Sequence, residues 1–147
     1  MSIDEKDKKI LSELMQNSRQ SYREIAKKVE LSTATVMHRV DELEKNGIIK
    51  KYTAHVDYEK LGFDVQVLID LRVSKGKLFE VEKKIAKHPN ISAVYDTTGE
   101  FDVTLVAKFK NRRAMDSFLK TIQTYEFVER TNTKLILNII KESGVQI

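Results

Sequence analysis

Apolar residues recur every three or four positions in three short stretches near the start of the chain. This spacing places them on one face of a helix. The first stretch predicts a helix over residues 4–16 that is capped by Asp4, and the polar run 16–20 ends it. Ser21 and Glu24 form a capping box, in which the hydroxyl and the carboxylate each bind a free backbone amide, so a second helix begins there. The inward side chains of these two helices are Ile10, Leu11, Leu14, Met15, Ile25, Ala26 and Val29.

The third stretch, residues 32–47, has both a start signal and a stop signal. Ser32 can cap the first backbone amides of a helix, and Gly47 supplies the left-handed residue that commonly ends one. Only the turn Glu30–Leu31 separates this helix from the one before it, so the two form a predicted helix-turn-helix. One face carries Val36, Val40 and Leu43, and the opposite face carries Ala34, His38, Asp41 and Lys45.

From residue 65 onward the pattern changes to strands and helices. Strict alternation of apolar and polar residues predicts a half-buried strand over 65–73. Further strands are expected at 91–98, at 102–109 and at about 127–140, and helical periodicity falls between them, from Leu78 to Ala86 and from Met115 to Ile122. The order strand, helix, strand, strand, helix, strand is that of a ferredoxin-like βαββαβ domain, so the fold class is α+β.

The segment between these halves is patterned differently from both. Residues 48–57 partly alternate apolar and polar side chains, as in a strand pair or wing. Residues 58–64 contain Gly62 and separate the two halves. We therefore expect a winged helix-turn-helix domain over 1–57, a hinge at 58–64 and the ferredoxin-like domain over 65–147.

The last predicted strand is apolar on both faces. Leu135, Leu137 and Ile139 point to one side, and Ile136 and Ile140 point to the other. Two helices cover only one face of a four-stranded sheet, so the second face needs another cover. A second copy of the chain is the simplest cover, which predicts a homodimer through sheet-to-sheet packing. A terminal segment is the alternative.

Composition narrows the class of protein. Hydrophobic residues make up 41% of the chain and charged residues 33%, as in ordinary soluble globular proteins. No apolar run approaches the roughly 20 residues that span a bilayer, and the charged start MSIDEKDKK differs from a secretory signal, so a cytoplasmic location is expected. The absence of cysteine excludes disulfides, thiolate catalysis and cysteine-bound metals.

The net charge of +4 invites a nucleic-acid interpretation, but the placement of the charges carries more information. Residues 1–60 hold 12 basic and 11 acidic side chains, so the helix-turn-helix half is almost neutral. A local basic patch is nevertheless enough to contact DNA phosphates. Such a patch is predicted from Arg19, Arg23, Lys27, Lys28, Arg39, Lys50 and Lys51.

The outward face of the helix over 32–47 is the candidate DNA-reading surface. Hydroxyl, imidazole and guanidinium groups can reach base edges or phosphates in a major groove. His38 is equally compatible with simple solvation, and Lys50 and Lys51 with a solvated strand end. The candidates at or next to base edges are Ser32, Thr33, Thr35, His38 and Arg39, and the backbone-contacting candidates are Arg19, Ser21, Tyr22, Arg23, Lys50 and Lys51.

In their order and spacing, these segments resemble the leucine-responsive regulatory protein/AsnC (Lrp/AsnC, feast/famine) transcriptional regulators. The resemblance covers nearly the whole chain and rests on IDEKDKKIL, SYREIAKKVELSTATVMHRVDELEKNGIIKKYTAHVD, the hinge KLGFD and the hairpin TTGEFDVTLV. Glu30 stands where a turn glycine is common, and Phe101 where tyrosine is common. The resemblance implies a winged helix-turn-helix joined to a RAM/ACT-like domain, homodimers that often assemble into octamers, and an amino-acid effector between dimers, with no cofactor.

The same resemblance implies an effector site at one hairpin and its facing strand. A free amino acid needs an acceptor for its ammonium group and donors for its carboxylate. Asp102 and the hairpin carbonyls suit the ammonium group, and the hydroxyls of Thr98, Thr131 and Thr133 suit the carboxylate. Bracing of the hairpin is the alternative role of Asp102. The family's positions fall on Thr97, Thr98, Gly99, Glu100, Phe101, Asp102, Arg130, Thr131, Asn132 and Thr133.

Catalysis is not expected from this sequence. Its three histidines lie in three different elements without zinc-ligand spacing, and it has no phosphate-binding glycine loop. The best enzymatic alternative is a carboxylate-based hydrolase, or a single divalent cation site, at Asp96, Glu100 and Asp102. Among DNA-binding proteins, the alternative is an architectural protein that wraps DNA without sensing an effector, and the near-neutral N-terminal half disfavours it. The sequence favours a sequence-specific, double-stranded-DNA-binding transcription regulator that responds to an amino acid.

Overall fold

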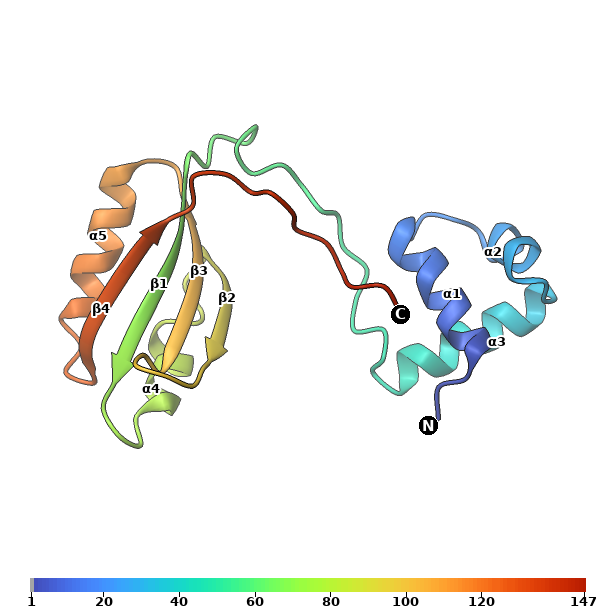
Figure 1. The fold of residues 1–147 in the computed structure, drawn as a ribbon, viewed down its shortest axis with the longest axis horizontal. Coiled ribbons are helices and arrows are strands. Elements are labelled where there is room, and N and C mark those ends of the chain that lie inside the picture. Colours follow the sequence, from blue (N-terminus) through green and yellow to red (C-terminus); the bar gives the residue numbers. More distant parts are fainter. Residues whose placement is uncertain (1) are drawn as a thin grey trace. The chain divides into compact units, whose positions relative to one another are not determined.

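The computed structural model describes residues 2–147 and divides them into two compact units. One unit contains the chain up to His55 together with the segment 141–147, and the other contains Val56–Ile140. Figure 1 shows the helices of the first unit and the sheet of the second. The division lies just before the expected hinge at 58–64. It also places the segment 141–147 with the helical unit, which the sequence pattern did not indicate.

The helical unit begins each of its helices at a predicted cap. The side chains of Asp4, Ser21 and Ser32 each accept a hydrogen bond from a backbone amide in the first turn, and the first two form full capping boxes. Gly47 has a φ of 69° and so adopts the left-handed conformation expected of it, just beyond the last helix. The helices are α1 (Glu5–Gln16), α2 (Tyr22–Val29) and α3 (Thr33–Lys45).

The predicted strand pair over residues 48–57 is not formed. This segment is irregular and mostly exposed, and in the described part of the chain no strand precedes Val65. A strand needs a hydrogen-bonded neighbour, and partial alternation in the sequence cannot supply one. Only Ile49 turns toward the helical core, where it packs beside buried side chains of all three helices.

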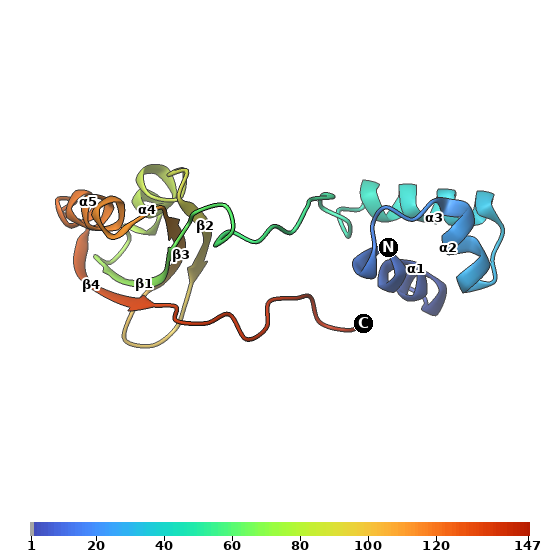
Figure 2. The same ribbon diagram turned by 90° about the horizontal axis from the view of Figure 1, so that it is seen from above.

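The second unit is a four-stranded antiparallel sheet with strand order β2-β3-β1-β4. Both of its helices cover the same face, as Figure 2 shows. The buried core lies between that face and the helices and includes Ile69, Leu71, Leu105, Phe109 and Ile122. The ferredoxin-like prediction is therefore confirmed. The elements are β1 (Val65–Val73), α4 (Leu78–Lys84), β2 (Ile91–Asp96), β3 (Val103–Phe109), α5 (Arg112–Gln123) and β4 (Val128–Leu135).

The last strand is shorter than predicted, because β4 ends at Leu135 rather than near residue 140. One further hydrogen bond joins the amide of Ile136 to the carbonyl of Gln66 at 2.8 Å, and the chain then leaves the sheet. The sequence could not show where β4 ends, because the alternation of apolar residues continues beyond the last residue of β4 that pairs with β1. The exposed apolar side chains beyond it include Leu137 and Ile140, which are 81% and 97% exposed.

The open face of the sheet is mixed in character and not wholly apolar. Leu68 and Val106 lie side by side on it and are half-buried. Next to them, the carboxylate of Asp70 accepts a hydrogen bond from Thr104 Oγ1 at 2.7 Å and pairs with Lys134 Nζ at 2.8 Å. Burial opposes ionisation of Asp70, but the contacts with Lys134 and Thr104 outweigh it and hold its pKa below the usual value. A partner on this face would therefore meet a charged pair as well as apolar side chains.

Part of the expected hinge is fixed to the second unit. Lys110 Nζ donates to the carbonyl of Leu61 at 2.6 Å and lies 4.0 Å from the ring centre of Phe63. Lys108 Nζ lies 4.9 Å from the ring centre of Tyr58. These cation–aromatic contacts hold the turn 58–63 against the end of β3.

Candidate nucleic-acid interface and effector site

The outward surface of α3 is richest in exposed side chains in its first half. Thr33, Ala34 and His38 are exposed, as the periodicity predicted. Met37 is 48% exposed on the same surface, and sequence reasoning missed it. The helical spacing could have found it, since position 37 follows 33 by four residues. A thioether chain there can make the apolar contact that a thymine methyl group offers in a major groove.

The start of α3 is suited to a phosphate. Ser32 Oγ accepts the amide of Thr35 at 3.1 Å, and the two hydroxyl oxygens are 2.7 Å apart. These hydroxyls therefore hold the first turn, and Thr35 is half-buried rather than exposed. The remaining amides of a helix N-terminus and its dipole attract anions. The hydroxyls of Ser32 and Thr35 thus organise this end of α3.

Arg39 does not occupy the position that the sequence suggested. Its Nη1 donates to both carboxylate oxygens of Asp4 at 2.9 Å and to Oδ1 of Asp7 at 2.8 Å. The Arg39 side chain is 24% exposed and that of Asp7 only 3%. Because the guanidinium group already binds two carboxylates of α1, the structure gives Arg39 the role of joining α3 to α1. Helical spacing could not reveal this, since the partners belong to another helix.

The same contacts shift the pKa values of the groups that make them. The backbone amide of Asp7 and the guanidinium group of Arg39 lower the pKa of Asp4. The carboxylates of Asp7 and Asp4 in turn raise the pKa of Arg39. Each charged form is thus stabilised by its neighbour. This cluster fixes the N-terminal end of α1 against the reading helix.

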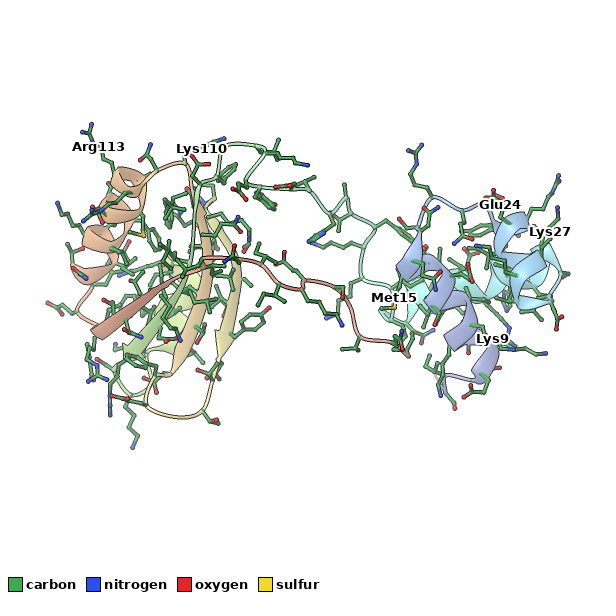
Figure 3. All side chains as sticks on the ribbon, turned by 45° about the horizontal axis from the view of Figure 1, so that its top comes forward. Lys9, Met15, Glu24, Lys27, Lys110 and Arg113 are labelled. Carbon is green, nitrogen blue, oxygen red and sulfur yellow. The ribbon has the colours of Figure 1, made fainter. Side chains whose placement is uncertain are left out.

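The flanking basic residues are exposed and lie around the helix-turn-helix. Arg19 is in the loop between α1 and α2, Arg23 is in the first turn of α2, and Lys50 and Lys51 follow α3. Lys27 also projects from α2, as Figure 3 shows together with Glu24. Lys28, in contrast, is paired with Glu13 at 2.8 Å. Exposed, flexible cations of this kind suit phosphate contacts.

Tyr22, a predicted contact to the DNA backbone, lies near the acidic second half of α3. It is half-buried against the helical core, and burial together with Glu44 and Asp41 raises its pKa. The hydroxyl of Tyr52 donates to Glu44 at 2.7 Å, and burial and this carboxylate raise the pKa of Tyr52 as well. The second half of α3 carries Asp41, Glu42 and Glu44, and such carboxylates repel phosphates. Ser21, the cap of α2, has its hydroxyl engaged with the amide of Glu24 at 3.1 Å.

The predicted effector hairpin is closed by contacts within the chain. The amide of Thr97 donates to the carbonyl of Asp102 at 2.8 Å, and Gly99 has a φ of 108°, which favours glycine. Glu100 forms an ion pair with Arg130, whose guanidinium carbon lies 4.8 Å from the ring centre of Phe101. The structure thus brings the tip of the hairpin together with Arg130, one of the predicted effector residues on the facing strand.

Asp102 has a structural contact in this arrangement. Its Oδ2 accepts the amide of Val73 at 2.7 Å, beside the irregularity where β1 pairs with β4. The bracing role that the sequence left open is therefore present. The second carboxylate oxygen is not engaged by any hydrogen bond in the described residues.

The predicted strand residues divide between the two faces of β4. Thr131 and Thr133 pair with Leu71 and Ile69, and so lie on the helix-covered side. Arg130 and Asn132 lie on the open side. Because β4 is an edge strand, a ligand held at its edge can reach both sets only together with another surface. The four predicted residues of β4 therefore do not share one face of the sheet.

The carboxylates around the hairpin do not form a metal site. Glu100 pairs with Arg130, and Asp102 binds the amide of Val73. Across residues 2–147 no three histidine, cysteine or acidic residues are grouped so that they could hold a metal ion. The same residues include no helix long and apolar enough to cross a membrane.

Comparison with known proteins identifies both halves of the chain. Residues 3–50 match the winged helix-turn-helix DNA-binding family, and residues 66–146 match the Lrp/AsnC ligand binding domain. The chain belongs to the Lrp/AsnC family of transcriptional regulators. An uncharacterised HTH-type transcriptional regulator of Pyrococcus furiosus is 42% identical over 142 residues, which cover 97% of this chain and 96% of that protein.

Two solved structures support the same assignment for the whole fold. Escherichia coli AsnC superposes with a TM-score of 0.92 at 26% identity and covers 100% of both chains. A transcriptional regulator of Neisseria meningitidis, in complex with L-Met, superposes with a TM-score of 0.87 at 28% identity and covers 97% of this chain and 94% of that chain. This Lrp/AsnC protein thus combines a DNA-binding helix-turn-helix with a small-molecule-binding domain. The departures at Glu30 and Phe101 leave the assignment intact.

Proposed function

We propose that this Lrp/AsnC protein binds specific double-stranded DNA as a homodimer and changes its binding in response to an amino acid held between dimers. The observation that carries the proposal is the joining, in one chain, of an exposed surface on α3 to a domain of the Lrp/AsnC ligand-binding family. The effector residues that we propose on β4 lie on both faces of an edge strand, so a second copy can supply the rest of the site. DNA binding and effector binding then depend on the same assembly.

The homodimer is supported by apolar surface that a single chain leaves exposed. Leu137 and Ile140 follow β4 and are almost fully exposed, and Tyr95 on the open face of the sheet is 57% exposed. Exposed large apolar side chains on a sheet face and beside its edge strand are commonly covered by a partner. A two-fold dimer through this region would present two α3 helices, so the operator should contain half-sites about 34 Å apart. Further assembly of dimers into octamers would create the interface that the effector needs.

The DNA contacts that we propose differ from those predicted from the sequence alone. Thr33, Met37 and His38 read base edges, because they are exposed on the first half of α3. The positively charged side chains that flank it bind the phosphate backbone. Arg39, Ser32 and Thr35 support the geometry of α3 and do not contact bases. The phosphate-binding residues are Arg19, Arg23, Lys27, Lys50 and Lys51.

The effector that we propose is a free amino acid. Arg130 and the hydroxyl of Thr98 can donate to its carboxylate, and the open oxygen of Asp102 can accept from its ammonium group. The related regulator from Neisseria meningitidis was solved with L-Met, which is an amino acid. Glu100 already occupies Arg130, so an incoming carboxylate has to displace it. Both groups of this pair are more than half exposed, and exchange at such a surface pair costs little.

The test is a DNA-binding titration in the presence of each of the twenty amino acids. An operator fragment is first selected from random DNA, and its dissociation constant is then compared with that of a shuffled fragment. We expect at least a hundredfold preference for the operator and a change in operator affinity with one or a few amino acids. Equal affinity for both fragments, with no amino-acid effect, would instead support an architectural DNA-wrapping protein.

A further inference from the structure

The segment 141–147, which we call the strap, contacts the helical unit although it follows the last strand of the other unit. The hydroxyl of Ser12 donates to the carbonyl of Ile147 at 3.4 Å. His55 Nε2 lies 3.5 Å from a carboxylate oxygen of Glu142. A hollow between α1 and the strap is lined by Ser12, Met15, Gln16 and the residues 143–147. The strap thus lies along the C-terminal half of α1.

Gly144 of the strap lies close to the side chain of Met15 on α1. A Cβ atom added there would lie 2.8 Å from Cε of Met15, so this glycine lets the strap backbone run directly over the methionine side chain. Figure 3 shows Met15 beside the end of the strap. Ser12, Met15 and Gln16 are three to four residues apart and share one face of α1, whereas Ile10 and Leu14 are buried in the core. The strap therefore covers a face of α1 that the core does not use.

The contacts of the strap are weak enough to be reversible. The side chains of His55 and Glu142 are 73% and 52% exposed, so their pairing is screened by water. Val145 also remains 78% exposed, so docking removes little apolar surface from water. An element held in this way can exist in docked and undocked forms.

The strap is closely tied to the strand that carries predicted effector residues. The amide of Ile136 is still bonded to β1, so only residues 137–140 separate the sheet from the strap. Four residues span at most about 14 Å. A displacement of the end of β4 that takes up the slack of these four residues would therefore pull on the strap. At the other end of α1, Asp4 and Asp7 bind Arg39 of α3.

We propose that the strap is a reversible tether that docks on α1 and couples the ligand-binding unit to the DNA-reading helix. It gives the two units a second covalent connection besides the segment after α3. Strap, α1 and Arg39 form a continuous series of contacts that ends on α3. The regulatory part of this inference rests on the proposed function, because β4 carries Arg130 of the proposed effector site. Docking of the strap does not depend on it.

The experiment uses the absence of cysteine in the chain. The full-length variant Met15→Cys/Gly144→Cys is oxidised with glutathione disulfide, and disulfide formation within one chain is followed on non-reducing gels. The matched control is Lys9→Cys/Gly144→Cys, because Lys9 lies about 9 Å further along the same helix. We expect the first pair to close at least tenfold faster than the control. Equal rates, or a link that joins two chains, would refute docking on the chain's own α1.

The same variant tests whether strap docking and DNA binding are coupled, because DNA should then affect docking. If the strap and α3 are coupled, operator DNA must change strap docking, because linkage between two sites acts in both directions. We expect selected operator DNA to change the rate of disulfide formation at least twofold, and shuffled DNA to change it less. An unchanged rate would refute the coupling. This readout needs no effector, so a failure to find a responsive amino acid counts against the proposed function and leaves this result intact.

Discussion

Replacing Arg39 by alanine should destabilise the helical unit and not simply remove a DNA contact. The substitution leaves Asp7, with a side chain 3% exposed, without the guanidinium group at its Oδ1. Its other oxygen keeps the amide of Asp4 at 3.0 Å. A buried group that loses one charged partner costs about 1–3 kcal/mol. Because the Arg39 side chain is itself 24% exposed, we expect a loss of about 2 kcal/mol in the free energy of unfolding.

The measurement is urea unfolding of the full-length protein, followed by the helical circular-dichroism signal. Arg23→Ala is the matched control, since Arg23 is exposed on α2 and its loss should stay within about 0.5 kcal/mol. Combining Arg39→Ala with Asp7→Asn should cost less than the sum of the two, with a coupling of about 1 kcal/mol or more. The reasoning is refuted if Arg39→Ala unfolds like the wild type but no longer distinguishes operator from shuffled DNA. In that case the guanidinium group leaves α1 and reads bases.

Three further results are expected. Glu30→Gly should raise the melting temperature, because Glu30 has a φ of 56° and a left-handed non-glycine residue costs about 1 kcal/mol; an unchanged or lower value contradicts this. Because the pKa of Asp4 is lowered in the folded protein, its stabilising contribution is present above its unfolded value of 3.8 and disappears as the pH falls through the lower folded value. Asp4→Asn should therefore weaken the pH dependence of the free energy of unfolding below pH 3.8, as measured by urea unfolding at several pH values. An unchanged pH dependence in this range would show that Asp4 does not contribute. His38→Ala should reduce operator preference, whereas Lys50→Ala should weaken all sequences alike and reduce the salt slope by about one; similar effects of both would make His38 a phosphate contact.

Sequence reasoning succeeded where the determining interaction is local. The caps Asp4, Ser21 and Ser32 each bind an amide three residues ahead. Gly47 adopts the left-handed conformation just after α3, as its residue type predicts. The strands and helices of the second unit follow from alternation and periodicity in the same way. Such features need only a few consecutive residues to be recognised. The order of elements was enough to give the ferredoxin-like fold.

Sequence reasoning failed where a side chain's partner is distant in the chain. Arg39 binds Asp4 and Asp7 across more than thirty positions, and the choice between DNA and α1 is not encoded in the spacing of α3. For Asp102 the sequence left bracing of the hairpin open as an alternative, but it could not name the partner, because only the pairing of β1 with β3 brings the amide of Val73 near. The segment after β4 was assigned to the sheet because its apolar alternation continues. Residues 136–140 instead leave the sheet after the bond between Ile136 and Gln66, and only the following segment 141–147 contacts α1.

These distant contacts place α1 between α3 and the strap. Its first turn is bound to α3 through Asp4, Asp7 and Arg39, and its last turns contact the strap through Ser12 and Met15. A helix of 12 residues is about 18 Å long and moves as a rigid body. A change in strap docking at one end can therefore alter the setting of α3 at the other without any contact between strap and DNA. Substitutions on the outward face of α1 should then change the amino-acid response more than the affinity for DNA.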